Sequence, residues 1–206
     1  MHTFTIIKNQ YLRQNIQAFY HADYLGYQRL GNPDYINAFK NTFNDTANVI
    51  LNNAVQKLET ILPTDLPQIQ KIIGINPITV CVVPRAKAEA NYQPNQLLFK
   101  STIRDVIKNQ QNDFYDGIDY ITRHTNTRTT HLPVNTPNYN NDGVIPYPGI
   151  TISTCNILDD VRGKHILLID DLYTKTINVD EDVIQALLDK GASSVTFYAI
   201  GRTVHN

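Results

Sequence analysis

The sequence predicts an α/β fold with a mostly parallel sheet flanked by helices. Two runs, Ile78–Val83 and His165–Ile169, are continuously apolar rather than alternating. Strands of this kind are buried on both faces, as in a parallel sheet covered by helices. The second run is followed by a helical pattern over Val179–Lys190, which Gly191 is placed to terminate as a C-terminal cap. A strand followed by a helix is the repeating unit of such folds.

The first 74 residues predict helices instead. A shorter helix is expected over residues 10–24, and a long amphipathic helix over Asn32–Leu62. Asn32 can cap this helix with Pro33 at its first position, and Pro63 and Pro67 are expected to end it. Its apolar side chains recur at steps of three and four, at Ile36, Phe39, Phe43, Ala47, Ile50, Ala54, Leu58 and Ile61. Residues 1–74 are therefore interpreted as a helical N-terminal extension, suited to packing, to a homodimer contact or to a partner protein.

Residues 75–206 are interpreted as the α/β domain. After the strand at Ile78–Val83 we expect a helix over Gln96–Asn109, a short strand over Ile118–Thr122 and a final strand over Val195–Ile200. Thr125–Gly149 is rich in Asn, Thr, Pro and Gly and has no periodicity. Because so long a connection is uncommon without a role, we interpret it as a functional lid, with partial disorder as the alternative.

Bulk composition excludes several classes of function. The 206 residues carry a formal net charge of −1, so no basic surface directs the chain to a membrane, and nucleic acid is an unlikely partner. Two cysteines, Cys81 and Cys155, make neither a disulfide framework nor a zinc site on their own. No apolar run approaches the roughly 18 residues of a membrane span, and the first residues do not resemble a signal peptide. A cytoplasmic location is the expectation.

The segment Ile166–Asp182 carries the clearest functional signal. A buried strand leads into Asp170 and Asp171, then into a loop with hydroxyl groups, and then into a helix. Ligands of open parallel sheets bind outside the carboxyl ends of the strands. The loop and the helix N-terminus suit an anion, with Thr174, Thr176, Asn178 and Lys175 as further donors. The two carboxylates suit a diol or a cation, so the segment predicts a site for a phosphorylated ribose. Alternatively, the acidic pair only ends a strand and caps a helix.

Two other designs with acidic strand ends fit less well. A phosphoacceptor receiver domain needs more chain after its acidic pair than follows Asp171 here. A dinucleotide-binding fold needs G-x-G-x-x-G after a strand, and the sequence contains no such run.

The segment ILLIDDLYTKTINVDEDV resembles the motif with which type I phosphoribosyltransferases bind 5-phosphoribosyl 1-diphosphate (PRPP). The following ALLDKGASSVTFYAIGRTV is similar to the helix, turn and last core strand of that family. VRGKHILLIDDLYT and VVPRAKAEANYQPNQLL are most similar to its ComF-like and amidophosphoribosyltransferase-like subset. The likeness spans residues 76–204 and is strongest over 161–204; residues 1–75 do not match.

The resemblance implies a set of site residues. Asp170 and Asp171 would bind the ribose hydroxyls, and Arg123, Arg128 and His131 would be candidates for reaching the leaving diphosphate. Mg²⁺ would accompany PRPP, with Asp170 and Asp171 as possible ligands. Catalytic roles fall to Asp170, Asp171 and Arg128, and PRPP binding to Pro84, Arg85, Ala86, Lys87, Asp170, Asp171, Leu172, Tyr173, Thr174, Lys175, Thr176, Ile177 and Asn178.

The sequence departs from the family pattern at Thr176, where the motif has glycine. Without glycine the loop loses a residue that adopts positive φ and allows phosphate close to the backbone. Three functions therefore stay open: a phosphoribosyltransferase acting on a nucleobase or amine, a catalytically inactive relative that binds PRPP or a nucleotide and regulates a partner, and an effector whose N-terminal helix does the work.

Overall fold

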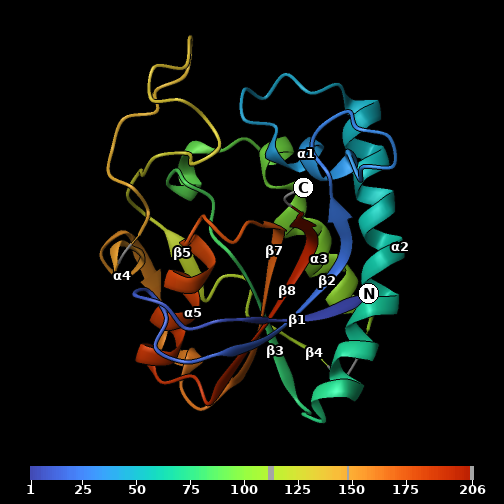
Figure 1. Ribbon diagram of the computed structural model, residues 1–206, viewed down its shortest axis with the longest axis vertical. Coiled ribbons are helices and arrows are strands. Elements are labelled where there is room, and N and C mark those ends of the chain that lie inside the picture. Colours follow the sequence, from blue (N-terminus) through green and yellow to red (C-terminus); the bar gives the residue numbers. More distant parts are fainter. Residues whose placement is uncertain (111–113, 148, 205–206) are drawn as a thin grey trace.

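A six-stranded sheet, in the order β1-β2-β8-β7-β3-β4, forms the centre of the molecule (Figure 1). The computed structural model describes residues 1–110, 114–147 and 149–204. Strands β2, β8, β7, β3 and β4 run parallel to one another, and β1 is antiparallel to β2. The predicted α/β class with a mostly parallel sheet is confirmed. The strands are β1 (His2–Ile6), β2 (Ile16–Tyr24), β3 (Ile78–Val82), β4 (Phe114–Asp116), β7 (His165–Tyr173) and β8 (Ser194–Thr203).

Helices cover both faces of this sheet. The helices α1 (Tyr35–Lys40), α2 (Asn48–Ile73) and α3 (Leu98–Asn109) pack on one face, and α5 (Val179–Lys190) packs on the other (Figure 1). Side chains of β7 alternate between the two cores: Leu167 and Ile169 face α2 and α3, whereas Ile166 and Leu168 face α5. Burial on both faces explains why this strand is continuously apolar.

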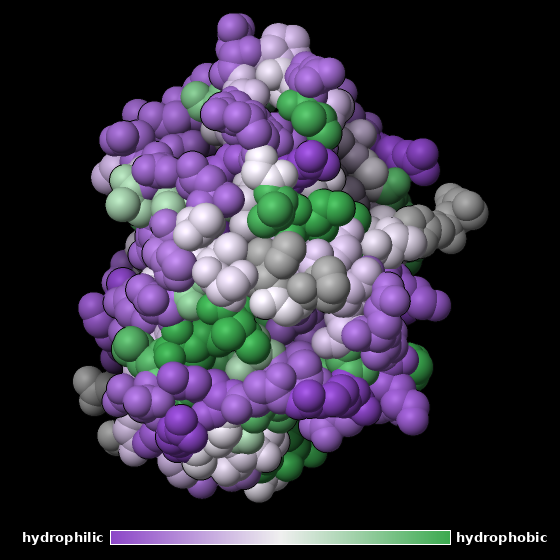
Figure 2. All heavy atoms as spheres, turned by 90° about the vertical axis from the view of Figure 1, so that its left-hand side faces the viewer, coloured by the Kyte–Doolittle hydropathy of each residue, from purple (hydrophilic) through white to green (hydrophobic). Residues whose placement is uncertain are grey.

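A smaller unit stands beside α5. It consists of a two-stranded antiparallel sheet, β5 (Ile121–Arg123) with β6 (Cys155–Ile157), and the short helix α4 (Ile150–Thr154). The molecular face on this side is mainly hydrophilic with separate hydrophobic patches (Figure 2). Ile152 in α4 and Leu158, which directly follows β6, are among the exposed apolar residues. No helix within the described ranges is both long enough and apolar enough to cross a membrane.

The expected helix over residues 10–24 is wrong, because the chain forms the strand β2 there. Phe19 and Tyr20, neighbours in sequence, are buried on opposite faces of the sheet, as the two-residue period of a strand requires. These residues form a strand because they pair with β8, and this tertiary contact outweighs their local helical pattern. Residues 1–74 therefore do not form a purely helical extension: they contribute β1 and β2 to the same sheet as the C-terminal strands.

The predicted helix over Asn32–Leu62 is interrupted. It forms as α1 and α2, separated by a loop at residues 41–47. Asn41 (φ 31°) and Asn44 (φ 56°) adopt the left-handed region, which asparagine tolerates better than most residues. The loop lies at the carboxyl ends of the strands, and this position makes it part of the site described below.

Helix α2 also continues through both prolines that were expected to end it. It runs to Ile73 and is terminated by Gly74 (φ 67°). An interior proline costs about 3 kcal/mol, and burying one Leu or Ile side chain gains about 1.5–3 kcal/mol. Beyond Pro63, Leu66 and Ile69 are fully buried, and Asp65 accepts a hydrogen bond from Tyr198 at 2.7 Å. These contacts offset the two missing backbone hydrogen bonds.

The second half of the chain follows the sequence prediction more closely. Helix α5 and its Gly191 cap (φ 104°) are confirmed, and α3 begins two residues later than expected. The short strand expected over Ile118–Thr122 forms at Ile121–Arg123. Strand β7 extends to Tyr173, so Asp170 and Asp171 lie within the strand rather than after it.

Candidate functional site

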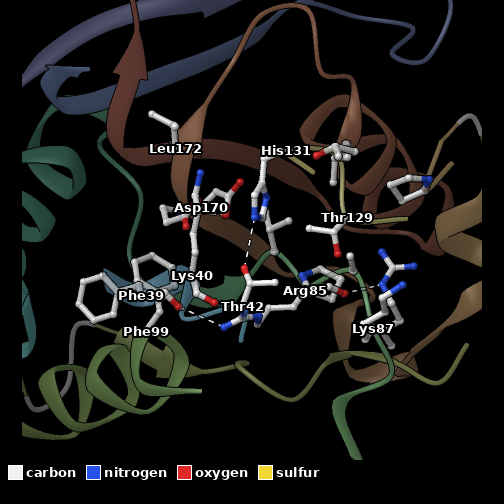
Figure 3. A pocket seen from close by; sticks show the side chains of 18 of the residues that line it. Phe39, Lys40, Thr42, Arg85, Lys87, Phe99, Thr129, His131, Asp170 and Leu172 are labelled. Carbon is white, nitrogen blue, oxygen red and sulfur yellow. Dashed lines mark hydrogen bonds between the residues drawn. The ribbon is translucent and has the colours of Figure 1, made fainter. Parts of the chain in front are cut away.

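A cavity of about 430 Å³ lies at the carboxyl ends of β3 and β7. Its walls come from many parts of the chain, among them the ends of these strands, the segment after β3, helix α1 with the loop after it, the start of α3, the segment 128–146, and the loop after β7 with the start of α5. Figure 3 shows Asp170, Lys40 and Phe39 toward one side of the cavity and Lys87 and Thr129 toward the other. Small-molecule sites in proteins typically enclose about 300–1,000 Å³, so the cavity fits one compact ligand.

The acidic wall is built by β7. Asp170, Asp171 and Leu172 line the cavity, and the backbone N–H of Asp171 donates to Asp170 Oδ1 at 2.8 Å. Burial, and after it the adjacent charge of Asp171, together raise the pKa of Asp170 to about 7. Strand β7 therefore presents to the cavity one carboxyl group, that of Asp170, that is not fully ionised at neutral pH.

The loop after β7 contributes less than the sequence predicts. Thr174 and Ile177 line the cavity and close a turn through Ile177 N to Thr174 O at 2.8 Å. Lys175 and Thr176 are exposed and lie outside the lining. No residue of 174–178 is among those with positive φ, so Thr176 adopts a backbone conformation that needs no glycine.

Two more predicted residues, Tyr173 and Asn178, point elsewhere. Tyr173 is buried, and its hydroxyl donates to Glu181 Oε1 at 3.0 Å. Asn178 Oδ1 accepts a hydrogen bond from Asn9 Nδ2 at 3.1 Å. Neither residue lines the cavity, so both hold the loop and the helix in place.

The segment after β3 lines the cavity as predicted, with Pro84, Arg85, Ala86 and Lys87. The Arg85 guanidinium, however, donates to the backbone carbonyl oxygens of Phe39 (3.1 Å), Lys40 and Gln96. It also stacks over the ring of Tyr92, 4.4 Å from the ring centre. Arg85 therefore fastens the end of α1 to the cavity wall, and most of its hydrogen-bonding capacity is used there.

Lys87 contacts two residues of the predicted lid segment. Lys87 Nζ donates to the carbonyl oxygen of Thr127 at 2.8 Å and lies 5.5 Å from the ring centre of Tyr139. An ammonium group has three donors, so this bond leaves capacity for an anionic ligand. Within the predicted lid, Thr125–Gly149, Pro148 lies outside the described residues.

Two arginines that line the cavity each keep one guanidinium nitrogen without a partner among the described residues. Arg123 is 3% exposed, and it donates from Nε to Arg85 O and from Nη1 to Thr154 Oγ1, both at 2.6 Å. Its Nη2 has no hydrogen-bond partner among the described residues, and the same holds for Arg128 Nε. Both residues line the cavity. Buried donors without partners are rare in native proteins, so both guanidinium groups keep unused hydrogen-bonding capacity.

Side-chain contacts connect the predicted lid to the loop after α1 across the mouth of the cavity. The Thr42 hydroxyl is hydrogen-bonded to His131 Nε2 at 3.3 Å (Figure 3). The rings of Phe43 and Tyr139 meet edge to face at 5.6 Å. Although much of the His131 surface is exposed, its ring faces the cavity. Desolvation of that ring, with the charges of Lys40 and Arg85, lowers the pKa of His131 to about 4. His131 is therefore neutral at pH 7.

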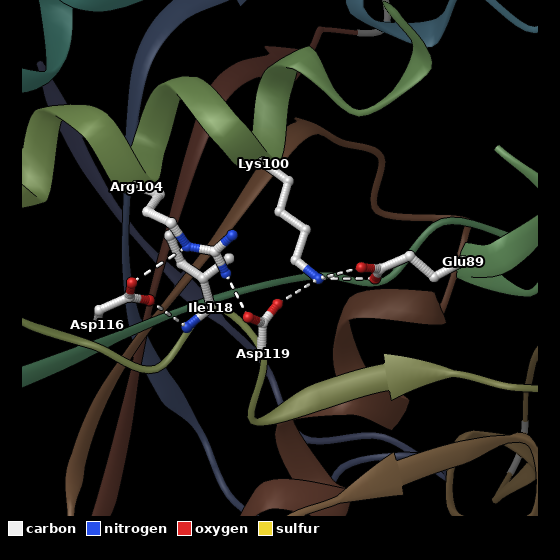
Figure 4. A network of polar contacts seen from close by, with 6 residues as sticks. All are labelled: Glu89, Lys100, Arg104, Asp116, Ile118 and Asp119. Carbon is white, nitrogen blue, oxygen red and sulfur yellow. Dashed lines mark hydrogen bonds and ion pairs between the residues drawn. The ribbon is translucent and has the colours of Figure 1, made fainter. Parts of the chain in front are cut away.

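An ion-pair network supports the segment after β3 from outside. Lys100 on α3 bonds Glu89 at 2.6 Å and Asp119 at 3.0 Å, and Arg104 bonds Asp119 at 2.6 Å and Asp116 at 3.1 Å (Figure 4). Glu89 and Lys100 also border the cavity. The network ties this segment to α3 and to the connection between β4 and β5.

Sequence analysis missed several lining residues. Helix α1 and the loop after it contribute Phe39, Lys40 and Thr42, which were assigned to a continuous helix remote from the site. The asparagines at positions 41 and 44 are turn formers and could have indicated the break. Other missed lining residues include Tyr24, Tyr92, Gln96, Phe99, Lys100 and Asp180.

Within the described ranges, no group of three or more His, Cys, Asp or Glu residues is arranged to hold a metal ion. The carboxylates of Asp170 and Asp171 are suitable oxygen ligands for Mg²⁺, which usually keeps several waters and shares substrate phosphates. The residues present thus fit a cation that arrives with a ligand. Comparisons of the chain with family models, with curated proteins and with solved structures gave no match.

Proposed function

We propose that the chain binds a phosphorylated ribose, expected to be PRPP, and transfers its phosphoribosyl group to a nitrogen nucleophile with release of pyrophosphate. One observation carries the proposal: the same cavity is lined by Asp170 and Asp171 and by Arg123 and Arg128, two arginines that each keep a guanidinium nitrogen without a partner among the described residues. Carboxyl groups accept hydrogen bonds from a diol, and guanidinium groups bind phosphate. PRPP presents both kinds of group at a separation of a few bonds.

The proposed reaction rests on positioning and charge stabilisation. The bond from ribose C1 to the diphosphate breaks, the bond from C1 to the acceptor nitrogen forms, and the acceptor loses a proton. The ribose is held by its hydroxyls at Asp170 and Asp171, while Lys87, Arg123 and Arg128 stabilise the negative charge of the departing diphosphate. Bound with the diphosphate, Mg²⁺ would neutralise further charge, with Asp170 and Asp171 as its ligands. The lid residues Thr129 and His131 exclude water from C1.

The Asp171→Asn variant tests the site. We expect it to lose PRPP binding while keeping the circular dichroism spectrum and the thermal unfolding midpoint of the wild type. Calorimetry with PRPP and Mg²⁺ measures the affinity. Unchanged affinity in the variant would show that Asp171 does not bind PRPP and would contradict the proposed orientation of the ligand.

A second candidate function is binding of PRPP or a nucleotide without turnover, as a regulatory or effector protein. Lys175 and Thr176 lie outside the cavity lining, and Arg85 donates to backbone carbonyl oxygens. Fewer groups are therefore available to bind the phosphates than the family motif implies. Pyrophosphate release with a panel of nucleobases and amines separates the candidates. Binding without release for any acceptor favours the regulatory function.

The third possibility, an effector acting through its N-terminal helix, needs a different test from deletion of residues 1–74. That deletion would remove β2 from the sheet and α2 from the core. Charge-changing substitutions on exposed positions of α2 preserve the fold and are the suitable probe of a partner contact.

A further inference from the structure

Lys40, the last residue of α1, lines the cavity from a helix that lies outside residues 76–204. Its side chain extends toward Asp170 (Figure 3). Desolvation, and after it the charge of Lys40, lowers the pKa of His131 to about 4. Burial raises the pKa of Asp170, and the charge of Lys40 opposes this rise. Because Asp170 and His131 both line the cavity, the ammonium group that acts on both of them lies in the ligand space.

The backbone that carries Lys40 is held in one position. Arg85 donates a hydrogen bond to the carbonyl oxygen of Lys40 itself. Gln96, which is 7% exposed, donates from Nε2 to the carbonyl oxygens of the next two residues, Asn41 at 3.0 Å and Thr42 at 3.1 Å. The break after α1 is therefore a fixed part of the cavity wall. A group that is positioned before a ligand arrives loses less conformational freedom on binding.

The ammonium group of Lys40 keeps its hydrogen-bonding capacity. Its Nζ has no hydrogen-bond or ion-pair partner among the residues that the structure describes. The two other lysines that line the cavity are engaged: Lys100 is paired with two carboxylates, and Lys87 donates to a carbonyl oxygen. An ammonium group has three donors, so Lys40 offers a whole cationic group to an anion in the cavity.

The cationic groups of the cavity are found on two sides. Lys87 and Arg123 belong to the side of the segment after β3, since Arg123 Nε donates to the carbonyl oxygen of Arg85 at 2.6 Å. Lys40 stands on the side of Asp170, away from Lys87 (Figure 3). A ligand with anionic groups at both ends of a ribose would meet a cation at each end. The loop after β7 does not supply the second cation, because Lys175 lies outside the lining.

We propose that Lys40 binds the phosphate group on C5 of the ligand's ribose. This inference rests on the proposed function, because it requires a ribose held at Asp170 and Asp171 with its diphosphate toward Lys87. It assigns to α1 the contact that the family motif assigns to the loop after β7. The first 74 residues then supply a ligand-binding group to the cavity as well as two strands to the sheet.

Three substitutions isolate the contact. Lys40→Met keeps most of the length of the side chain and removes its charge, whereas Lys40→Arg keeps a cation that binds phosphate. The exposed Lys57, on α2, provides Lys57→Met as a control with the same change of charge remote from the cavity. Lys87→Met removes the cation on the opposite side and serves as the reciprocal variant.

The experiment is calorimetric titration of the full chain with ribose 5-phosphate and, separately, with inorganic pyrophosphate. Lys40→Met is expected to weaken ribose 5-phosphate binding about tenfold or more, and to leave pyrophosphate affinity within about twofold. Lys87→Met is expected to show the reverse preference. Lys40→Arg is expected to recover most of the ribose 5-phosphate affinity, and Lys57→Met to bind both ligands as the wild type does. If Lys40→Met does not fold, as judged by circular dichroism, Lys40→Gln carries the same expectation.

Each result bears on one of the two assignments. Unchanged ribose 5-phosphate affinity in Lys40→Met overturns the role of Lys40 and leaves the proposed function standing. Equal weakening of both ligands also overturns it, because a general loss of positive charge does not discriminate between the two sides. If the wild type binds neither ligand, the proposed function itself fails.

Discussion

Thr127 is hydrogen-bonded twice to the carbonyl oxygen of Ala86, through its backbone N–H and through its hydroxyl, each at 2.8 Å. Ala86 belongs to the segment after β3, and Thr127 stands at the base of the lid. Asn126 Oδ1 adds a bond from Ala88 N at 2.8 Å. The lid is thus anchored at its base to the wall that carries Lys87, while its far part spans the mouth.

Thr127→Val keeps the shape of the side chain and removes the hydroxyl bond. We expect a loss of about 1 kcal/mol of unfolding free energy, typical of one neutral hydrogen bond. Amide hydrogen exchange is expected to accelerate at the base of the lid, with little change in β7. Thr130→Val, at an exposed lid position, is the control. Equal acceleration in both variants would show that the Thr127 bond does not anchor the lid.

Arg85→Met removes the donors that hold the carbonyl oxygens of Phe39, Lys40 and Gln96. Because hydrogen bonds from a charged donor contribute about 1.5–3 kcal/mol each, the variant is expected to lose about 2 kcal/mol or more of stability in urea unfolding. Arg85→Lys restores the charge without the planar fork and is expected to recover only part of the loss. Wild-type stability combined with lost ligand affinity would contradict the structural role and assign Arg85 to the ligand.

The acidic wall predicts a pH dependence of stability. The pKa of Asp170 is raised to about 7 in the folded chain, above its unfolded value, so the folded state binds more protons between about pH 4 and pH 7. The contribution of this group is therefore present at low pH and is lost as the pH rises through about 7. Asp170→Asn, which cannot ionise, is expected to stabilise the chain more at pH 8 than at pH 5, measured as the shift in the urea midpoint. An equal shift at both pH values would argue against the raised pKa.

Helix α2 offers a stabilising substitution. Pro67 is exposed and lies inside the helix, where it supplies no N–H to the carbonyl oxygen four residues earlier. Pro67→Ala is expected to raise the unfolding free energy by about 1 kcal/mol or more, since a restored backbone bond outweighs the greater freedom of the unfolded chain. Pro33→Ala, outside α2, is the comparison and is not expected to stabilise. A destabilised Pro67→Ala variant would indicate that the helix depends on the proline.

The sequence predicted the second half of the fold well because its signals there are local. The apolar run of β7, the pattern of α5 and the Gly191 cap each depend on neighbouring residues. Strand β2 could not be recognised in the same way, because its partner β8 lies near the other end of the chain. The continuation of α2 through Pro63 and Pro67 likewise depends on burial that a local pattern does not reveal.

The sequence predicted those parts of the candidate site in which neighbouring residues of one short segment all line the cavity. Asp170 and Asp171 on β7 and Pro84–Lys87 after β3 line one cavity. The predicted phosphate loop is only half in place, because the turn from Thr174 to Ile177 directs Lys175 and Thr176 to solvent. Lys40 and Asp180 were missed, since they reach the cavity only through the break after α1 and the packing of α5.

The position of β8 between β2 and β7 has a consequence for the order of folding. Strand β2 is made early in synthesis, but the neighbour that joins it to the rest of the sheet is made more than a hundred residues later. Until then the β1–β2 hairpin has an open edge and an apolar surface, the features that favour aggregation and recruit chaperones. The non-local pairing also slows folding, since a long loop must close before the contact forms. Pairing of β8 with β2 and β7 is expected to be the step that brings the cavity residues of the N-terminal part, such as Lys40, next to Asp170 and Asp171 on β7.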